Sequence, residues 1–236
     1  MTTNKDLAMF KGKTDLSTRT TRVGQGSQNV SASDMAIPRI KLLQLISKEV
    51  MPSDPQYIEG AQAGMFMNSV TNELYSSIYV INLHFSRKTV AWKKRRLGGG
   101  MFGTFENEVE AETALLAVGE QVDNYDISEN PTHLVMIVDD EGNPQGVALF
   151  DMPGSKIKNS KKWNTLINKQ EEAGNPRFGC VWELSVIAET NASGPFSNCE
   201  ANFIVHAPDA IYKAASSAYD AFFKQADSDT ETPEAA

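Results

Sequence analysis

The sequence predicts an α+β fold that is mostly β, with a few helices added. Residues 78–92 alternate between apolar and polar side chains, which is the period of a half-buried strand. Residues 178–188 alternate in the same way, and a turn separates them from a second strand at 196–205. Residues 160–173 repeat their apolar side chains at helical spacing, and Gly174 follows where a C-terminal cap would stand. We therefore expect a sheet with helices packed on it.

The strand at 78–92 is long, and its two faces differ in character. One face is apolar and is expected to pack inward. Its residues are Tyr79, Ile81, Leu83 and Phe85. The other face becomes basic and aromatic toward its end, as a ligand-facing surface would. Its residues are His84, Ser86, Lys88, Val90, Trp92 and Lys94.

The remaining elements are shorter. We predict strands at 64–70, 134–138 and 147–150, a turn at 139–144, a helix at 106–118, a glycine-rich loop at 97–102, and a last helix that begins at Pro208. The apolar run at 37–46 is compatible with a helix or with an extended segment, because Pro38 suits either.

The length of 236 residues suits one large domain with tails. Residues 1–34 are polar and lack periodicity, so we expect a flexible N-terminal arm there. Residues 35–224 are expected to form a single domain. Residues 225–236 contain four acids and no base, and are expected to form an acidic, disordered C-terminal tail.

Charge is segregated along the chain, whose formal net charge is -8. Half of its 22 Lys and Arg residues lie in two windows, 87–96 and 156–169, and neither window contains an acid. Residues 106–129, between these windows, hold eight acids and no base. The acidity of the whole chain therefore does not argue against a polyanionic partner, but it confines such binding to one face.

Residues 85–103 carry the strongest functional signal, because they combine six basic side chains, three aromatic rings and four glycines without an acid. Bases can stack on aromatic rings while Lys and Arg contact phosphates, which is the chemistry of single-strand binding. In this interpretation Trp92 and Phe102 stack on bases, and the loop around Gly99 closes over a nucleic-acid backbone. The predicted phosphate contacts are Arg87, Lys88, Lys93, Lys94, Arg95 and Arg96.

Two other interpretations of this segment are possible. Charge at a strand end often serves only solubility, although repulsion among the consecutive cations at 93–96 costs stability unless an anion offsets it. Gly98, Gly100 and Gly103 also match the dinucleotide-binding fingerprint. A lone match is weak, however, and the residues before it are basic rather than those of a buried apolar strand. Binding of a polyanion is therefore preferred.

A second basic cluster precedes or opens the predicted helix at 160–173. Its members are Lys156, Lys158, Lys161 and Lys162. A helix N-terminus favours anions through its dipole and its free N–H groups, so these lysines are expected to extend the nucleic-acid site. An ordinary solvated helix start is the alternative. Trp163 has the spacing of a core residue and is not expected to stack on a base.

Sequence motifs for metal binding and catalysis are absent. The sequence has no Cys-x-x-Cys pair, no His-Glu-x-x-His motif, no phosphate-binding loop and no Gly-x-Ser-x-Gly elbow. We therefore expect no enzyme activity, no metal and no other cofactor, although a nuclease that holds a metal with some of the many acids stays open. No run approaches the roughly 18 apolar residues that span a bilayer, so no membrane partner is expected.

The two cysteines, Cys180 and Cys199, fall on strands that are predicted to pair, so a disulfide is conceivable. Reduced core thiols are preferred, because residues 1–22 are polar and show no secretory signal.

Three stretches of the chain carry a family resemblance. They are Ile37-Pro-Arg-Ile-Lys-Leu-Leu-Gln44, Tyr57-Ile-Glu-Gly-Ala61, and Trp92 through the Gly98-Gly-Gly100 loop. They resemble a group of bacteriophage-encoded proteins associated with single-stranded DNA binding in replication, over roughly residues 35–205. The predicted order of elements, with a helix between the third and fourth strands, is similar to the oligonucleotide-binding (OB) fold. The resemblance implies an OB-fold-like antiparallel barrel, no cofactor and the cytoplasm of the infected cell.

The sequence thus predicts a protein that binds single-stranded DNA without sequence preference in phage DNA replication or recombination. The acidic tail would recruit replication proteins or compete with DNA, although its end, Pro-Glu-Ala-Ala236, lacks the apolar anchor that such tails often carry. The alternative is a phage structural or assembly protein whose basic patch contacts another protein. A nucleotide-binding enzyme that uses the glycine loop comes third. The oligomeric state is not predicted.

Overall fold

The chain divides into two units, Met1–Ala36 and Ile37–Ala236. The computed structural model describes residues 20, 23–30, 34–192 and 194–230. The described part of the first unit forms turns, in which the Val23 N–H donates to the Thr20 carbonyl at 3.3 Å. Most of the flexible arm predicted for residues 1–34 therefore lies outside the described residues. All elements discussed below belong to the second unit.

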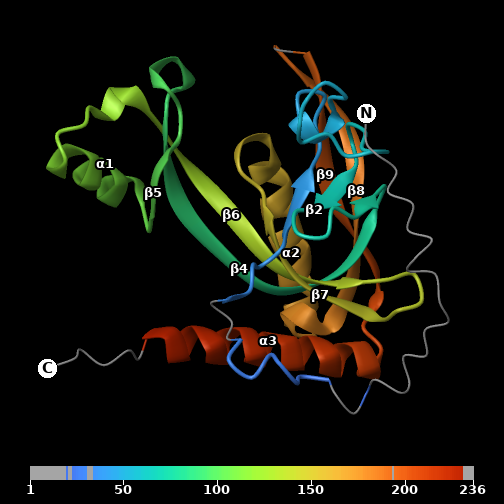
Figure 1. Ribbon diagram of the computed structural model, residues 1–236. Coiled ribbons are helices and arrows are strands. Elements are labelled where there is room, and N and C mark those ends of the chain that lie inside the picture. The colour runs from blue at the N-terminus through green and yellow to red at the C-terminus, as the bar shows by residue number, and fades with distance from the viewer. Residues whose placement is uncertain (1–19, 21–22, 31–33, 193, 231–236) are drawn as a thin grey trace, which may run out of the picture. The chain divides into compact units, whose positions relative to one another are not determined.

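One sheet forms the framework of this unit (Figure 1). In the described part of the chain it has nine strands, in the order β3-β2-β1-β7-β6-β4-β8-β9, and β5 pairs with β4 off this path. Every pairing is antiparallel except that of β1 with β7. The strands are β1 (Arg39–Leu42), β2 (Phe66–Asn68), β3 (Leu74–Tyr75), β4 (Ile78–Lys93), β5 (Met101–Phe105), β6 (Tyr125–Val138), β7 (Pro144–Asp151), β8 (Cys180–Asn191) and β9 (Gly194–His206).

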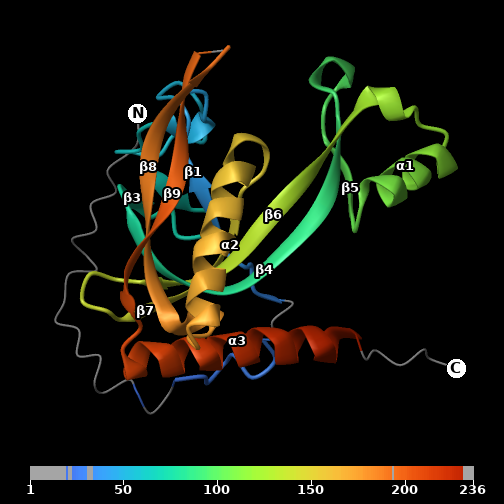
Figure 2. The same cartoon turned by 180° about the vertical axis from the view of Figure 1, so that it is seen from behind.

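Three helices accompany the sheet: α1 (Glu108–Ala117), α2 (Ile157–Glu172) and α3 (Asp209–Thr230). Figure 2 shows α2 inside the curl of the sheet, where Trp163 and Ile167 join the larger core with Val80 of β4. Helix α3 covers the opposite face, where Ala215 is buried beside Ile81. The prediction of a mostly β, α+β chain built on a barrel-like sheet with added helices is confirmed, and the sheet is a strongly curled half-barrel.

The Gln44 side chain bridges the open side of the half-barrel. Gln44, just after β1, donates from Nε2 to the Ser197 carbonyl of β9 at 2.8 Å and accepts from the Ser197 N–H at 3.0 Å. These are the two hydrogen bonds that a neighbouring strand would make, and a side-chain amide supplies both. The Ser197 N–H and carbonyl on the open edge of β9 therefore have hydrogen-bond partners without a second neighbouring strand.

A β-bulge in the middle of β4 corrects the predicted alternation of this strand. Asn82 pairs with Val135 and His84 pairs with Leu134, so Leu83 is an extra residue without a partner. A one-residue insertion turns every following side chain to the other face. The sequence predicts Phe85 on the same face as Ile81, which α3 covers. This prediction is wrong, because Phe85 contacts the His133 ring on the α2 side. Both faces of β4 are buried at its start, because a helix covers each of them.

Several element bounds also differ from prediction. Strand β6 begins at Tyr125, well before the predicted residue 134, because it pairs with β4 along its whole length. The predicted loop at 97–102 is shorter, since β5 begins at Met101. The run at 37–46 is extended, as β1. Helix α3 continues to Thr230, so the predicted tail is helical at its start, and its remainder lies outside the described residues.

A buried polar network joins α2 to the sheet. The fully buried His133 of β6 accepts at Nδ1 from the Asn82 amide at 2.8 Å, so its Nε2 carries the proton and donates to Ser160 of α2, also at 2.8 Å. The Arg177 guanidinium donates to the other end of Asn82 at 3.0 Å. Burial, with Arg177 nearby, lowers the pKa of His133 to about 3, so this imidazole is neutral.

The two cysteines are free and buried, as predicted. Although β8 and β9 pair, Cys199 lies opposite Val186, and Cys180 lies opposite His206. Burial raises the pKa of both thiols, that of Cys199 to about 12. Because the thiolate is the reactive form, we expect neither cysteine to react with a thiol-specific chromogenic disulfide in the native protein at pH 8. Both should react after denaturation, and rapid labelling of the native protein would contradict this packing.

Candidate nucleic-acid interface

The second half of β4, β5, α1 and the first half of β6 form an arm, residues 86–130, which extends from the rest of the unit (Figure 1). The arm has a small core of its own, in which Ala91, Ala111, Leu115 and Tyr125 are buried. Small alanines on β4 and α1 allow the helix to lie close to the strands. Asn107 caps α1 by accepting a hydrogen bond from the Glu110 N–H at 3.0 Å.

The tip of the arm is the connection between β4 and β5. It consists of the 3₁₀ turn η5 (Arg95–Leu97) and three glycines, Gly98, Gly99 and Gly100, whose φ angles of 100°, 69° and 104° favour glycine. An antiparallel strand follows these glycines, and the Lys93 N–H donates to the Gly100 carbonyl at 2.8 Å. A dinucleotide fingerprint needs a helix at this point, so the glycines here form a hairpin turn instead.

The acidic window at 106–129 folds back onto the basic window of β4. Ion pairs join Arg87 to Glu129 (3.4 Å), Lys88 to Glu106, and Lys93 to Glu120 (3.2 Å). The Lys94 ammonium donates to the Asp123 carbonyl at 2.7 Å. These acids therefore supply part of the anionic charge that the consecutive cations require. These acidic partners were not predicted from the sequence, although an acidic window soon after a basic one is a signal for such pairing.

Two cations of the tip have no acidic partner in the part of the chain that the structure describes. Arg95 and Arg96 are exposed, and neither forms an ion pair within the described part of the chain. Trp92 lies just before them at the end of β4, and 48% of its surface is exposed. An exposed tryptophan beside free guanidinium groups is available for both stacking and phosphate contact.

The two predicted stacking residues lie on opposite faces of the hairpin. The Phe102 ring packs on Tyr125 and Phe105, which belong with the buried Ala91 to the face that α1 covers. Trp92 follows Ala91 in the strand, so its side chain points to the other face. A register shift, which leaves Phe102 without a partner while Trp92 pairs with Met101, accounts for this separation. The structure therefore does not bring Trp92 and Phe102 together in one groove.

The second basic cluster lies on a different element, at the start of α2. Lys158 pairs with Glu189 (2.8 Å) and Lys162 with Glu200 (3.3 Å), and both acids belong to the β8–β9 pair. Lys156 is partly buried, and desolvation lowers its pKa. Lys161 is exposed and has no ion pair among the described residues. Trp163 is buried, as predicted for a core residue.

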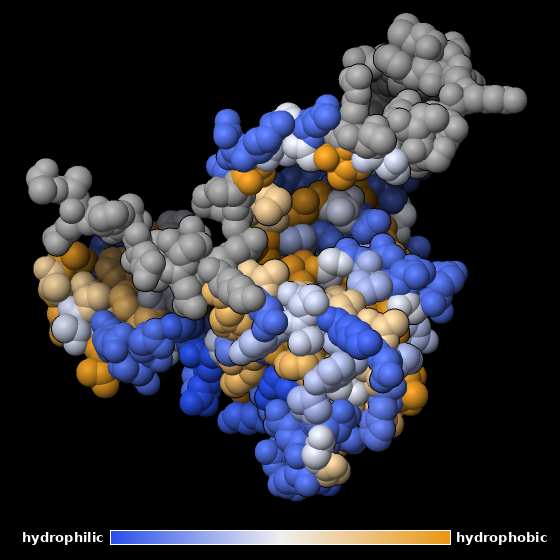
Figure 3. Space-filling model, turned by 90° about the horizontal axis from the view of Figure 1, so that it is seen from below, coloured by the Kyte–Doolittle hydropathy of each residue, from blue (hydrophilic) through white to orange (hydrophobic). Residues whose placement is uncertain are grey.

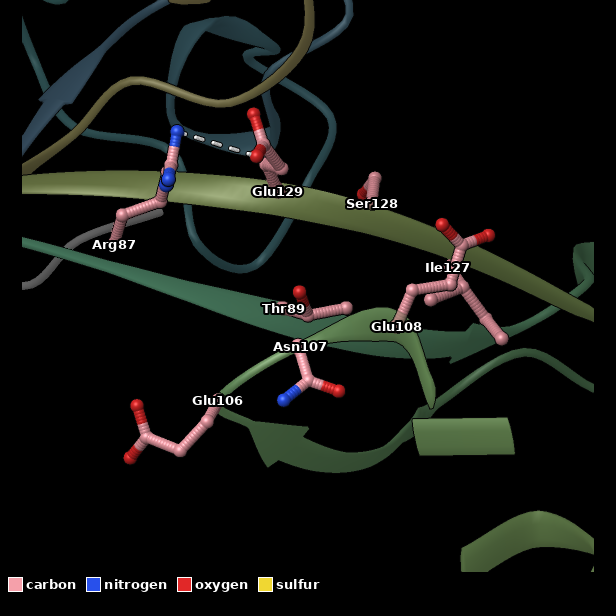
Figure 4. Close-up of a pocket in the computed structure, with 8 residues that line it drawn as sticks. All are labelled: Arg87, Thr89, Glu106, Asn107, Glu108, Ile127, Ser128 and Glu129. Atoms are coloured by element: carbon pink, nitrogen blue, oxygen red, sulfur yellow. Dashed lines mark ion pairs between the residues drawn. The ribbon is translucent and has the colours of Figure 1, made fainter. Parts of the chain in front are cut away.

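A shallow cavity of about 310 Å³ lies where β5 turns into α1 (Figure 4). Its lining combines one guanidinium group, three carboxylates, two hydroxyl groups and an amide, with Ile127 as an apolar wall. The lining residues are Arg87, Thr89, Glu106, Asn107, Glu108, Ile127, Ser128 and Glu129. This cavity is rich in hydrogen-bond acceptors, so it is unsuited to a phosphate group.

The surface of the arm also exposes apolar side chains. They come from the tip and from α1 and are Leu97, Met101, Val109, Leu116 and Val118. In Figure 3 the arm lies at the left, with hydrophobic surface visible beside hydrophilic surface. Large apolar side chains that are exposed are typical of a binding surface where they lie together, as Val109 and Leu116 can on α1, seven residues apart.

Comparison with known proteins gives one family match. The model of the family described as Pam3 phage gp34-like protein matches residues 6–227. No curated protein and no solved structure matches. Among the described residues, no group of three or more His, Cys, Asp or Glu side chains is placed to hold a metal ion. None of the helices in the part of the chain that the structure describes has the length and apolar character needed to cross a bilayer.

Proposed function

The chain belongs to the Pam3 phage gp34-like family and is therefore a phage protein, and from this premise we propose that it binds single-stranded DNA in phage replication or recombination. The proposed contact is the tip of the arm. The observation that carries this proposal is the exposed Trp92, which is followed closely by two arginines without carboxylate partners in the described structure. No catalysis and no cofactor are needed for such binding, and the proposed location is the cytoplasm of the infected cell.

The chemistry of the tip suits a single strand better than a duplex. Every base offers a π face to a tryptophan, and only unpaired bases can be unstacked and laid on it at low cost. Arg95 and Arg96 would contact the phosphates that flank the stacked base. The glycine turn lets the backbone of the strand approach closely, since Gly98 and Gly100 have no atoms nearby on the side where a Cβ would stand.

The ion pairs of the arm reduce the number of predicted basic residues that are free to contact phosphate. Arg87 and Lys88 lie next to acids that would repel a phosphate, whereas Arg95 and Arg96 do not. We therefore propose that the tip residues dominate binding, while Arg87, Lys88 and the α2 lysines contribute less.

The test is a fluorescence anisotropy titration with a labelled poly(dT) oligonucleotide, at low and moderate salt, beside the matching duplex. We expect salt-dependent binding that prefers the single strand. Trp92→Ala should weaken it by roughly 1–3 kcal/mol. Arg95→Ala with Arg96→Ala should reduce the slope of log K against log salt by roughly 1.4, at about 0.7 per phosphate contact.

Arg87→Ala is the matched control, because this arginine lies on the arm but is paired with Glu129. We expect it to change affinity less than the loss of either tip arginine. An equal loss of affinity in Arg87→Ala would show that the site extends beyond the tip to the basic residues of β4, as the sequence predicts. No binding of the wild-type protein at low salt would end the nucleic-acid proposal.

A second candidate function is contact with another phage protein during assembly. The observation that favours it is the exposed apolar surface of the arm, from Met101 to Val118. Tryptophan fluorescence separates the two functions. A stacked base quenches Trp92, whereas an arm that binds only protein would leave the emission unchanged when oligonucleotide is added.

A further inference from the structure

We propose that the cavity at the β5–α1 junction receives an arginine side chain from the arm tip of a second copy of this chain. The cavity is lined by residues of β4, β6 and the start of α1, so its shape depends on the arm alone (Figure 4). This inference goes beyond DNA binding, because it concerns contact between copies in the absence of any nucleic acid.

The charges around the cavity leave one carboxylate unbalanced. Glu129 pairs with Arg87, and Glu106 pairs with Lys88 on the other side of the strand. Glu108 forms no ion pair within the described residues, and it lines the cavity. A ligand that carries one positive charge and several hydrogen-bond donors would complete this arrangement, and the guanidinium group has both properties.

The side chain of Thr89 points to the same ligand. Thr89 is only 6% exposed, yet its side chain makes no hydrogen bond to any described residue. Figure 4 shows Thr89 on β4 at the cavity, between Arg87 and Glu108. The Thr89 oxygen is not among the fully enclosed atoms without a partner, so it is accessible from the cavity. A guanidinium group in the cavity could donate to the Thr89 oxygen and to the Glu108 carboxylate together.

The chain carries suitable arginines, but they cannot reach their own cavity. Thr89 and Lys93 are separated by about 13 Å along the strand, and Arg95 and Arg96 lie beyond Lys93. Both arginines are exposed and lack a carboxylate partner in the described structure. The same chain therefore presents an unpaired donor at the tip and an unpaired acceptor set at the base of the arm. The apolar Leu97 of the tip would meet the Ile127 wall of the cavity.

A contact of tip to cavity joins two different surfaces. A pair of copies therefore still offers one free cavity, on the copy whose tip is bound, and one free tip, on the copy whose cavity is filled. Such a heterologous contact extends into a chain or closes into a ring. It is expected to be weak and salt-sensitive, because few residues are involved and the charges are exposed. Arg95 and Arg96 are also the proposed phosphate contacts, so single-stranded DNA and a second copy would compete for the same tip.

Disulfide trapping between two variants tests this contact without DNA. One variant is Leu97→Cys at the tip, and the other is Ser128→Cys in the cavity wall; both retain Glu108 and the two arginines. Cys180 and Cys199 are buried and do not compete. We expect the 1:1 mixture, oxidised at low salt, to give several-fold more mixed dimer than Leu97→Cys mixed with Thr113→Cys, an exposed position of α1 outside the cavity lining.

Two further variants decide whether the charges drive the contact. Adding Glu108→Lys to the Ser128→Cys chain, or Arg95→Glu and Arg96→Glu to the Leu97→Cys chain, should abolish the excess of mixed dimer, with native circular dichroism retained. An unchanged yield in either variant would overturn the proposal. Equal trapping at Thr113→Cys would also overturn it. So would an absence of trapping when free arginine stabilises the wild type against unfolding more than it stabilises Glu108→Lys, because the cavity would then bind arginine but not the arginine of a second copy. Because no DNA is present, these outcomes are independent of the anisotropy titration.

Discussion

Replacing Trp163 with alanine is expected to lower the free energy of unfolding by about 3–5 kcal/mol, which is the usual cost of removing a large buried aromatic side chain. Trp163 is 1% exposed and stands at the centre of the larger core. Its ring stacks on His133 with centroids 4.4 Å apart and meets Trp182 edge-on at 6.3 Å. The truncation would leave a cavity between α2 and the sheet, and it would remove the cover of the His133 network.

Urea unfolding followed by circular dichroism measures this effect, and Trp92→Ala is its matched control. Both variants lose an indole ring, but Trp92 is half-exposed at the end of the arm. Its loss should change the free energy of unfolding by about 0.5 kcal/mol or less. Equal losses of stability in the two variants would contradict the assignment of one tryptophan to the core and the other to the surface.

The second large expected effect is a loss of folding stability at acidic pH, caused by His133. The pKa of His133 is lowered from 6.5 to about 3 in the folded protein by burial and by Arg177. The unfolded chain therefore binds a proton below pH 6.5 that the native protein does not bind. Stability is complete above pH 6.5 and falls by about 1.4 kcal/mol for each pH unit below it. His133 alone should thus cost about 2 kcal/mol at pH 5, and the loss should continue until about pH 3.

The measurement compares the pH dependence of unfolding in the wild type and in His133→Gln. Glutamine is neutral and can still accept and donate hydrogen bonds. The carboxylates, and His84, whose pKa is also lowered by burial, are common to both proteins, so they cancel in the difference. We expect the wild type to lose about 2 kcal/mol more than the variant between pH 6.5 and pH 5. Parallel pH profiles would show that His133 is not held neutral.

Much of the fold could be predicted because its elements keep regular periods. The alternation at 178–188 and the helical spacing around Trp163 lie on β8 and α2. The first half of β6 was missed because its residues 125–130 are mostly polar, and pairing with β4 alone makes them a strand. The bulge at Leu83 was missed for a related reason. One inserted apolar residue in an apolar run leaves the composition unchanged, so the change of face has no local signal.

Only part of the arrangement of the candidate site could be read from the sequence. The basic and aromatic composition of residues 85–103 identified the segment that forms β4, the tip and β5. Composition could not show that α1 and β6 return along it, so that Glu106, Glu120 and Glu129 neutralise half of its cations. Nor could it show that the partly exposed Phe102 ring packs against Tyr125 on the α1 face, since the register of a hairpin depends on its turn and bulges.

The bridge that Gln44 makes to Ser197 has a consequence for motion. Strands that pair along a ladder separate only when several hydrogen bonds break together, whereas a side-chain amide can rotate away by itself. The two hydrogen bonds at this seam can therefore break by a local fluctuation, without unfolding of β1 or β9 and without separating the apolar core that these strands share. The curl of the half-barrel, which encloses α2, is thus held on this side by apolar packing and by a polar contact that can break and re-form while the core stays intact.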